Sequence, residues 1–262
     1  MTINEIIKKL ILKNNVLFNS VGVKIVSVYD ALLEATIYNK DKAKPGCNMC
    51  AVNDTDTVYI HSRCLDDWKT EIFTFRDWSK VSSILNLFSD DVDISMKLDE
   101  DNSPCLMKFS SPVAKVNHYL QSKKFVKIQE NSNGAYKKIK FTLETLTESN
   151  IDIEKDCLRQ MSRASSILDD KSFKLVSEDN NVFAIFGDET NTVDNIKILI
   201  GKTIEGIRFP NITAKFSFED FQSVLKSYSL MEGKTYIQFF QDKIYFSNTD
   251  DRLITSTIIR AK

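Results

Sequence analysis

The sequence predicts an α+β protein made of two similar halves, each with an antiparallel sheet and two helices on one face of that sheet. Short runs that alternate apolar and polar residues predict strands along most of the chain. Four other segments repeat apolar residues at helical spacing. A pattern of residue types near the second helical segment recurs near the fourth, which indicates a duplicated unit. Short helices, two to each half, can cover only one face of a sheet.

The composition is that of an ordinary globular protein. A chain of 262 residues, with 42% hydrophobic and 27% charged residues, can build a core, which excludes a disordered, fibrous or membrane-embedded protein. Seven glycines and four prolines exclude a collagen-like segment and a glycine-rich phosphate loop. No basic stretch with a following apolar run opens the sequence, and no stretch approaches about 20 apolar residues. We therefore expect a soluble, cytoplasmic protein without a membrane partner.

The first half is expected to begin with an amphipathic helix over residues 3–14, where isoleucine and leucine recur at helical spacing. Asp77 can cap a second helix over 78–88. Strands are expected over residues 23–26, 33–38, 58–60, 71–75, 92–98, 106–110 and 113–120.

A boundary between two domains is expected near the middle of the chain. Residues 121–137 lack a sustained period and contain an Asn-Ser-Asn-Gly run, so they are predicted to connect domains at 1–120 and 138–262. The second half should contain a helix over 154–168 and another around Lys226. Its strands are expected over residues 139–143, 173–176, 182–186, 196–200 and 243–246.

Two segments share one order of residue types. Residues 73–78 read FTFRDW and residues 216–221 read FSFEDF, so both give aromatic, any residue, aromatic, charged, Asp, aromatic. Ile94 lies 17 residues after Asp77, as Ile237 does after Asp220. Such agreement in type and spacing predicts that the two halves are copies of one module.

Charges of opposite sign are segregated among the predicted elements. A net charge of −1 argues against a protein that coats nucleic acid with its whole surface, but it allows a local basic face. Acidic residues cluster in the turns near Asp91 and Glu100, whereas the helices carry cations that could contact phosphates. An ordinary solvated helix face is the alternative interpretation. The helix cations are Lys8, Lys9, Lys13, Arg76, Lys80, Lys155, Arg159, Arg163 and Lys226.

Several segments resemble the sliding clamps, the DNA polymerase processivity factors, and within them the clamps of T-even-like bacteriophages and the PCNA-like family. The resemblance is closest at residues 51–53, 57–59 and 72–95, and it resumes at 158–163 (LRQMSR). By element order it covers the whole chain. It implies a duplicated DNA-clamp fold that assembles into a ring, usually of three two-domain protomers, with helices around the hole and sheets outside. It also implies that the protein has no catalytic activity and no cofactor.

The resemblance also implies partners and positions. The ring would encircle double-stranded DNA without sequence preference, tether the replicative DNA polymerase and be opened by a clamp-loader ATPase, in the host cytoplasm if phage-encoded. The helix cations would face DNA. A partner peptide would enter an apolar pocket bordered by Phe125, Ile128, Ile258 and Ile259. Ring closure would pair strand 113–120 with a neighbour's strand 196–200 through an interface that includes Val113, Val116, His118, Leu120, Ile196, Ile198 and Ile200.

A zinc site is the strongest competing signal. Cys47, Cys50, His61 and Cys64 have a spacing that structural zinc sites use. Residues three apart on a strand point to opposite faces, which would separate Cys47 from Cys50 and leave small buried thiols instead. An odd count of five cysteines without a secretory signal favours reduced thiols.

Two other functions remain as alternatives. One is a phage structural or assembly protein on a duplicated sheet scaffold, which would not form a discrete ring on DNA. The other is a zinc-containing or metal-dependent protein that acts on nucleic acid. For the latter, Asp91 with Asp93 and Asp99 with Asp101 could bind Mg²⁺, although carboxylates in turns are usually solvated. The sequence contains no HExxH motif and no P-loop motif, so we expect no enzyme.

Overall fold

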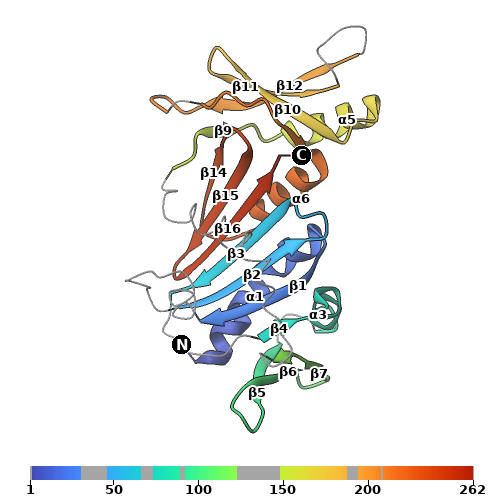
Figure 1. Ribbon diagram of the computed structural model, residues 1–262, viewed down its shortest axis with the longest axis vertical. Helices are drawn as coiled ribbons and strands as arrows, with labels where there is room; N and C mark the ends of the chain where they lie inside the picture. Colours follow the sequence, from blue (N-terminus) through green and yellow to red (C-terminus); the bar gives the residue numbers. More distant parts are fainter. Residues whose placement is uncertain are drawn as a thin grey trace.

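The computed structural model shows an elongated molecule with its strands in three sheets (Figure 1). The structure describes residues 2–30, 46–65, 73–88, 92–122, 148–187, 194–207 and 209–261. The expected strands at 33–38 and 139–143 lie outside these residues.

The described residues contain four helices, two from each half of the chain, as predicted. They are α1 (Ile3–Ser20), α3 (Trp78–Leu85), α5 (Cys157–Leu168) and α6 (Phe218–Ser229). A capping box formed by Thr2 and Glu5 starts α1, which continues six residues beyond the expected end at Asn14. The side chain of Asp77 caps α3 through the backbone amide of Lys80, as the sequence predicted.

The strands of the first half agree with the alternating runs, except for two that were not among the expected strands: β2, which contains Cys47 and Cys50, and β8, which begins the segment predicted as the connector. They are β1 (Val23–Asp30), β2 (Cys47–Asn53), β3 (Val58–Cys64), β4 (Phe73–Phe75), β5 (Asp93–Leu98), β6 (Pro104–Ser110), β7 (Lys115–Tyr119) and β8 (Gln121–Ser122). The strands of the second half are β9 (Ile151–Ile153), β10 (Ser172–Glu178), β11 (Asn181–Phe186), β12 (Ile196–Thr203), β13 (Lys215–Ser217), β14 (Lys234–Phe239), β15 (Lys243–Asp250) and β16 (Leu253–Arg260).

One pattern, a helix followed by three strands, occurs four times in the described parts of the chain. The four units are α1 with β1–β3, α3 with β5–β7, α5 with β10–β12 and α6 with β14–β16. A short strand precedes the helix in the last three units, namely β4, β9 and β13. The pairing repeats as well, since β4 pairs with β1 and β13 pairs with β10. The duplication predicted from the aromatic pattern is therefore confirmed.

The two halves share one continuous sheet. Its eight strands run in the order β14-β15-β16-β3-β2-β1-β4-β8, so strands from the end of the sequence lie beside strands from its beginning. We call the antiparallel pairing of β16 with β3, from Leu253 opposite Cys64 to Ile259 opposite Val58, the central seam. A five-stranded sheet, β13-β10-β11-β12-β9, and a three-stranded sheet, β5-β6-β7, lie at the two ends of the long axis (Figure 1).

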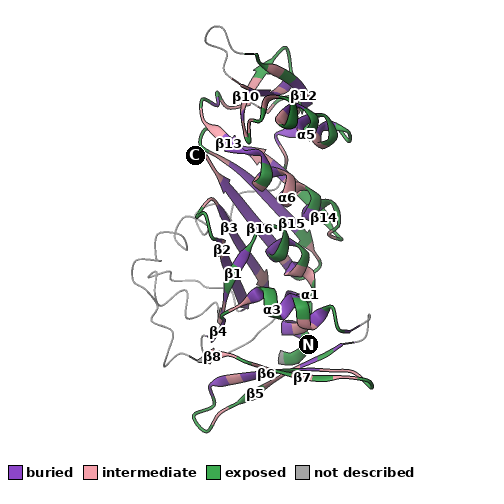
Figure 2. Ribbon diagram, turned by 90° about the vertical axis from the view of Figure 1, so that its right-hand side faces the viewer, coloured by how far each residue is buried: buried purple, intermediate pink, exposed green. Residues whose placement is uncertain are grey.

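The helices lie on the same side of the sheets, and the main core fills the space between the two (Figure 2). The duplicated aromatic residues are fully or nearly fully buried there, with Phe75 packed edge-on against Trp78 and Phe173 against Phe221. None of the helices in the described ranges is long and apolar enough to cross a membrane.

Candidate nucleic-acid interface and partner surfaces

The strongest cationic row lies on α5. Arg159 and Arg163 are exposed on this helix, and exposed Lys155 lies in the turn before it. The buried residues of α5, Cys157, Met161 and Ala164, anchor the opposite side of the helix in the core. Arg159 pairs with Asp156 at 3.6 Å, but both side chains are mostly exposed, so the guanidinium can still reach a phosphate. The helix therefore presents the predicted row to solvent.

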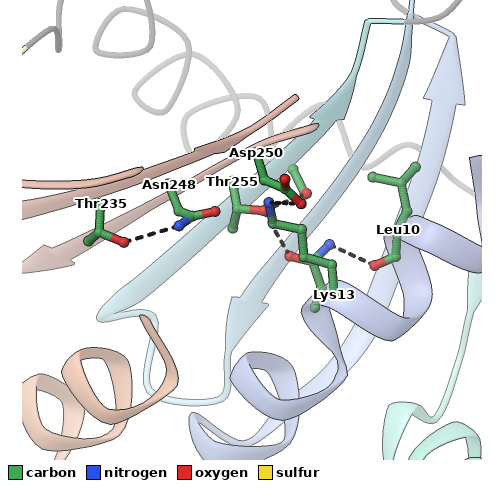
Figure 3. A network of polar contacts seen from close by, with 8 residues as sticks. Leu10, Lys13, Thr235, Asn248, Asp250 and Thr255 are labelled. Carbon is green, nitrogen blue, oxygen red and sulfur yellow. Dashed lines mark hydrogen bonds and ion pairs between the residues drawn. The ribbon is translucent and has the colours of Figure 1, made fainter. Parts of the chain in front are cut away.

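The cations of α1 are arranged differently. Lys9 is exposed, whereas Lys8 lies 3.9 Å from the carboxylate of Asp93 on β5. The side chain of Lys13 is only 9% exposed, and its ammonium points into the sheet, 3.5 Å from Asp250 of β15 (Figure 3). Burial lowers the pKa of Lys13, and the charges of Asp250 and Glu232 partly offset that effect. The prediction that Lys13 faces DNA is wrong, because its charge is directed into the protein.

The helices α3 and α6 carry less available positive charge than predicted. Lys80 is exposed but pairs with Asp77 at 3.7 Å, and exposed Arg76 donates to the side chain of Gln121 at 2.8 Å. On α6, exposed Lys226 is outnumbered by the first-turn acids Glu219 and Asp220. The cationic bias therefore differs among the helices and is strongest on α5.

The two strand edges expected for ring closure lie at opposite ends of the molecule. Strand β7 pairs only with β6, so its other edge is free in the described part of the chain. Strand β12 pairs with β11 along its length, but β9 covers only residues 201–203 of its other edge. Residues 196–199 of β12 therefore keep unpaired backbone groups on that side in the described structure. Both edges are the ones expected for ring closure (Figure 1).

The predicted interface residues in and beside β7 and on β12 divide into inward and outward positions. Val113 is 91% exposed, whereas half-buried His118 stacks on Phe75 with ring centroids 6.0 Å apart. Ile198 and Ile200 are buried in the core of their own protomer. The remaining predicted positions, Val116, Leu120 and Ile196, are half-buried.

Two exposed apolar residues beside these edges were not singled out from the sequence. Tyr119 at the end of β7 is 78% exposed, and Ile167 near the end of α5 is 72% exposed. Helix α5 packs against β12, the strand that carries the second edge, and Ile167 lies on the exposed side of this helix. The signal that could have revealed them is an apolar residue at a position where the strand or helix pattern expects a polar one.

The outer face of the central sheet carries a second, smaller apolar cluster. Tyr59, Tyr245 and Ile258 form it, with Val52 and Phe240 against them. Tyr59 donates to Asp56 at 2.7 Å and accepts from Arg260 at 3.1 Å.

Of the residues expected to border a peptide pocket, only Ile258 lies in this cluster. Ile259 is fully buried in the main core on the helix side, because adjacent strand residues point to opposite faces. The prediction that Ile259 borders the peptide pocket is therefore wrong. Phe125 and Ile128 lie outside the described residues.

The four predicted zinc ligands separate into two pairs. Cys47 lies opposite Cys64 and Cys50 lies opposite His61 across strands β2 and β3. Cys47 and Cys64 belong to the main core, so Cys50 and His61 point to the other face. Burial raises the pKa of Cys50 to about 12 and lowers that of His61 to about 3. No metal-ligand cluster occurs among the described residues, and the four-ligand zinc hypothesis is wrong for this geometry.

The predicted carboxylate pairs are likewise engaged in local structure. Asp99 accepts from the backbone amides of Asp101 and Ser103 at 3.0 and 2.8 Å, so it stabilises the turn between β5 and β6. Asp93 pairs with Lys8, and Asp91 lies outside the described residues.

Comparison with known proteins places this fold among the PCNA-type clamps. No protein-family model matches the sequence, and no curated protein matches it. Three similar solved structures are the PCNA2–PCNA3 complex of Sulfolobus tokodaii, the Proliferating Cellular Nuclear Antigen of Entamoeba histolytica and the PCNA of Thermococcus kodakaraensis. Their TM-scores are 0.56, 0.54 and 0.55, with 9%, 12% and 11% sequence identity. The matches cover 95%, 98% and 91% of this chain, and 96%, 95% and 100% of the others. The chain thus has the duplicated clamp fold.

Proposed function

We propose that this protein is a sliding clamp, a ring that encircles duplex DNA and tethers the replicative polymerase without chemistry of its own. The observation that carries the proposal is the combination of helices on one side of the sheets with an open strand edge at each end. The PCNA-type fold of the whole chain supports the same interpretation.

Ring closure follows from the two different edges. Residues 115–119 of β7 on one protomer add to residues 196–199 of β12 on the next, which extends a sheet across the boundary. Because the two surfaces differ, the contact is head-to-tail and closes only at a fixed number of copies, which we propose to be three. Tyr119 and Ile167 supply exposed apolar surface beside this pairing.

DNA would lie against the helix side of the ring, with α5 as the main phosphate-contacting helix. Arg159, Arg163 and Lys155 supply exposed charge there, and Lys9 and Lys226 add isolated cations. Contacts of this kind go to the phosphate backbone and carry no sequence preference. Modest attraction leaves the ring free to slide, while enclosure prevents dissociation.

Polymerase and the clamp loader would dock through short peptides on the outer face. Such a peptide would lie beside Val52 and Phe240, which are half-buried against the cluster of Tyr59, Tyr245 and Ile258 next to the central seam; the three cluster residues are themselves buried. The polar ends of Tyr59 and Arg260 at its border can orient the peptide backbone.

The test is topological. The protein is equilibrated with nicked circular duplex DNA, its subunits are joined with glutaraldehyde, and free protein is removed by gel filtration at high salt. Half of the sample is then linearised with a restriction enzyme. A clamp remains on the circle and is lost from the linear DNA. Equal retention on both DNAs would contradict enclosure, and so would an oligomer that does not have a fixed number of subunits in sedimentation.

A further inference from the structure

The strands β5 and β14 are equivalent in the two halves, yet the backbone groups on their outward edges have different hydrogen-bond partners. The shared spacing from Asp77 and Asp220 makes Ile94 correspond to Ile237 and Met96 to Phe239. Both strands pair on one side with the next strand of their unit, β6 or β15. The opposite edge of β14 faces residues 149–150, which precede α5, whereas the first turns of α1 lie beside the opposite edge of β5.

In the second half, a segment of the chain itself fills this edge. The amide of Ile237 donates to Ser149 Oγ at 3.0 Å, and the amide of Asn150 donates to the carbonyl of Ile237 at 3.1 Å. The side chain of Asn150 accepts from the amide of Phe239 at 2.9 Å and donates to its carbonyl at 2.8 Å. Four hydrogen bonds therefore satisfy the outward groups of two residues of β14.

In the first half, a single side chain reaches the equivalent edge. Asn4 Oδ1 accepts from the amide of Met96 at 3.2 Å, in the position that Asn150 Oδ1 takes at Phe239. Outward groups alternate along an antiparallel strand, so the amide and carbonyl of Ile94 and the carbonyl of Met96 face the same side. In the described part of the chain, these three groups have no hydrogen-bond partner on that side.

Carboxylates lie at both ends of this edge, with Lys8 beside those at one end and Lys97 beside those at the other. The side chain of Asp93 at the start of β5 is 90% exposed, although it lies near Lys8. At the other end, a shallow concavity is lined by Lys97, Leu98 and Cys105 and by three acidic turn residues, Asp99, Glu100 and Asp101. An extended chain that lay along β5 would pass from one acidic region to the other.

We propose that the outward edge of β5 is a docking site for an extended, basic segment of a partner protein. The segment adds to β5 as a fourth strand of the three-stranded sheet, as residues 149–150 do on β14. A small polar residue bonds the strand edge, and a basic side chain lies against the turn at Asp99–Asp101. This site is separate from the outer cluster of Tyr59, Tyr245 and Ile258, and it requires neither a ring nor DNA.

The experiment uses the full chain and two synthetic peptides. Both carry the sequence of Ser149, Asn150 and Ile151; one has two lysines after it and the other has two lysines before it. Binding is followed by fluorescence anisotropy, and the amide of Ile94 by hydrogen exchange. We expect one of the two orientations to bind and to slow exchange at Ile94 at least tenfold.

Three variants test the details. Asn4→Ala removes the side chain at the Met96 amide, so the peptide should bind several-fold more tightly. Glu100→Lys should weaken binding several-fold by repelling the lysines, while Glu205→Lys, an exposed acid elsewhere, leaves it unchanged. Circular dichroism confirms that each variant is folded.

Three results would overturn the proposal. They are absence of protection at Ile94 with either peptide at millimolar concentration, indifference to Glu100→Lys, and protection of Ile94 that rises with protein concentration alone. Protection that rises with protein concentration alone would show that a second copy of the chain binds this edge. None of these outcomes depends on DNA enclosure. If the docking proposal fails, the clamp proposal is still tested separately by retention on circular and linear DNA.

Discussion

The hydroxyl of Thr255 on β16 donates to the side-chain oxygen of Asn14 on α1 at 3.3 Å, deep between the two halves (Figure 3). The same hydroxyl lies 2.8 Å from that of Ser62 across the central seam, and the amide of Asn14 bonds the carbonyl of Leu10 at 2.7 Å. All three side chains are fully buried. A polar chain inside an apolar layer favours one register, because any slip leaves its groups unpaired.

Thr255→Val should therefore destabilise the whole protein. We expect the free energy of unfolding to fall by about 1–3 kcal/mol, because Asn14 and Ser62 lose a buried partner. Urea denaturation followed by fluorescence measures this value. Thr249→Val on the neighbouring strand is the control, since Thr249 is exposed. An equal effect of both variants would contradict the role of the polar chain.

The cations of α5 should dominate the attraction to DNA. Replacing Arg159 and Arg163 by Gln should lower the slope of log K against log salt by about 2 for each protomer in contact with duplex DNA. The melting temperature should not change, since both side chains are exposed. Lys13→Met is the matched control, because the buried Lys13 pairs with Asp250 and should leave the slope unchanged. If Lys13→Met lowered the salt slope more than the two arginine replacements do, α5 would not be the main DNA-contacting helix.

The ring contact should depend on the exposed apolar residues at the two edges. Tyr119→Lys and Ile167→Glu each place a charge where a neighbouring protomer would bury an apolar side chain, so each should give monomers in sedimentation velocity. Ile25→Lys changes an equally apolar side chain that is 59% exposed on β1, and it should leave the oligomer intact. Dissociation by all three variants would show a general loss of solubility instead.

Stability should fall in acid because His61 is buried and neutral. Burial lowers its pKa from the ordinary 6.5 to about 3, so below about pH 6.5 the unfolded chain binds a proton that the folded chain does not. The free energy of unfolding should decrease by about 1.4 kcal/mol per pH unit from about pH 6.5 toward pH 3, and should be insensitive to this group above pH 6.5. Urea titrations at several pH values measure the slope. His61→Gln should reduce the slope of the free energy of unfolding against pH. An unchanged slope would show that His61 is not the cause of the loss of stability in acid.

The fold was largely readable from the sequence because its signals are local. The aromatic pattern at 73–78 and 216–221 marks the repeat, and the two segments form equivalent elements. The spacing of Cys47 and Cys50 on a strand also predicted their separation, which the register confirms. Each of these inferences depends on residues that are neighbours in sequence.

What could not be predicted depends on pairings between distant segments. Lys13 resembles the other helix lysines in sequence, and only its packing beneath β15 shows that Asp250 neutralises it. The open edge of β5 could not be inferred either. Asn4 bonds only the amide of Met96, whereas Asn150 bonds both the amide and the carbonyl of Phe239, and the sequence does not show this difference. Similarly, the exposure of Tyr119 follows from β7 being the last strand of its sheet.

The central seam has a consequence for synthesis on the ribosome. Ser62 and Thr255, which meet across it, are 193 residues apart in sequence. While the chain is being translated, the side of β3 that will receive β16 stays uncovered for most of that time, and it is a template for incorrect pairing with other nascent chains. A protein with this architecture should therefore fold late and depend on chaperones more than a protein whose sheets close locally.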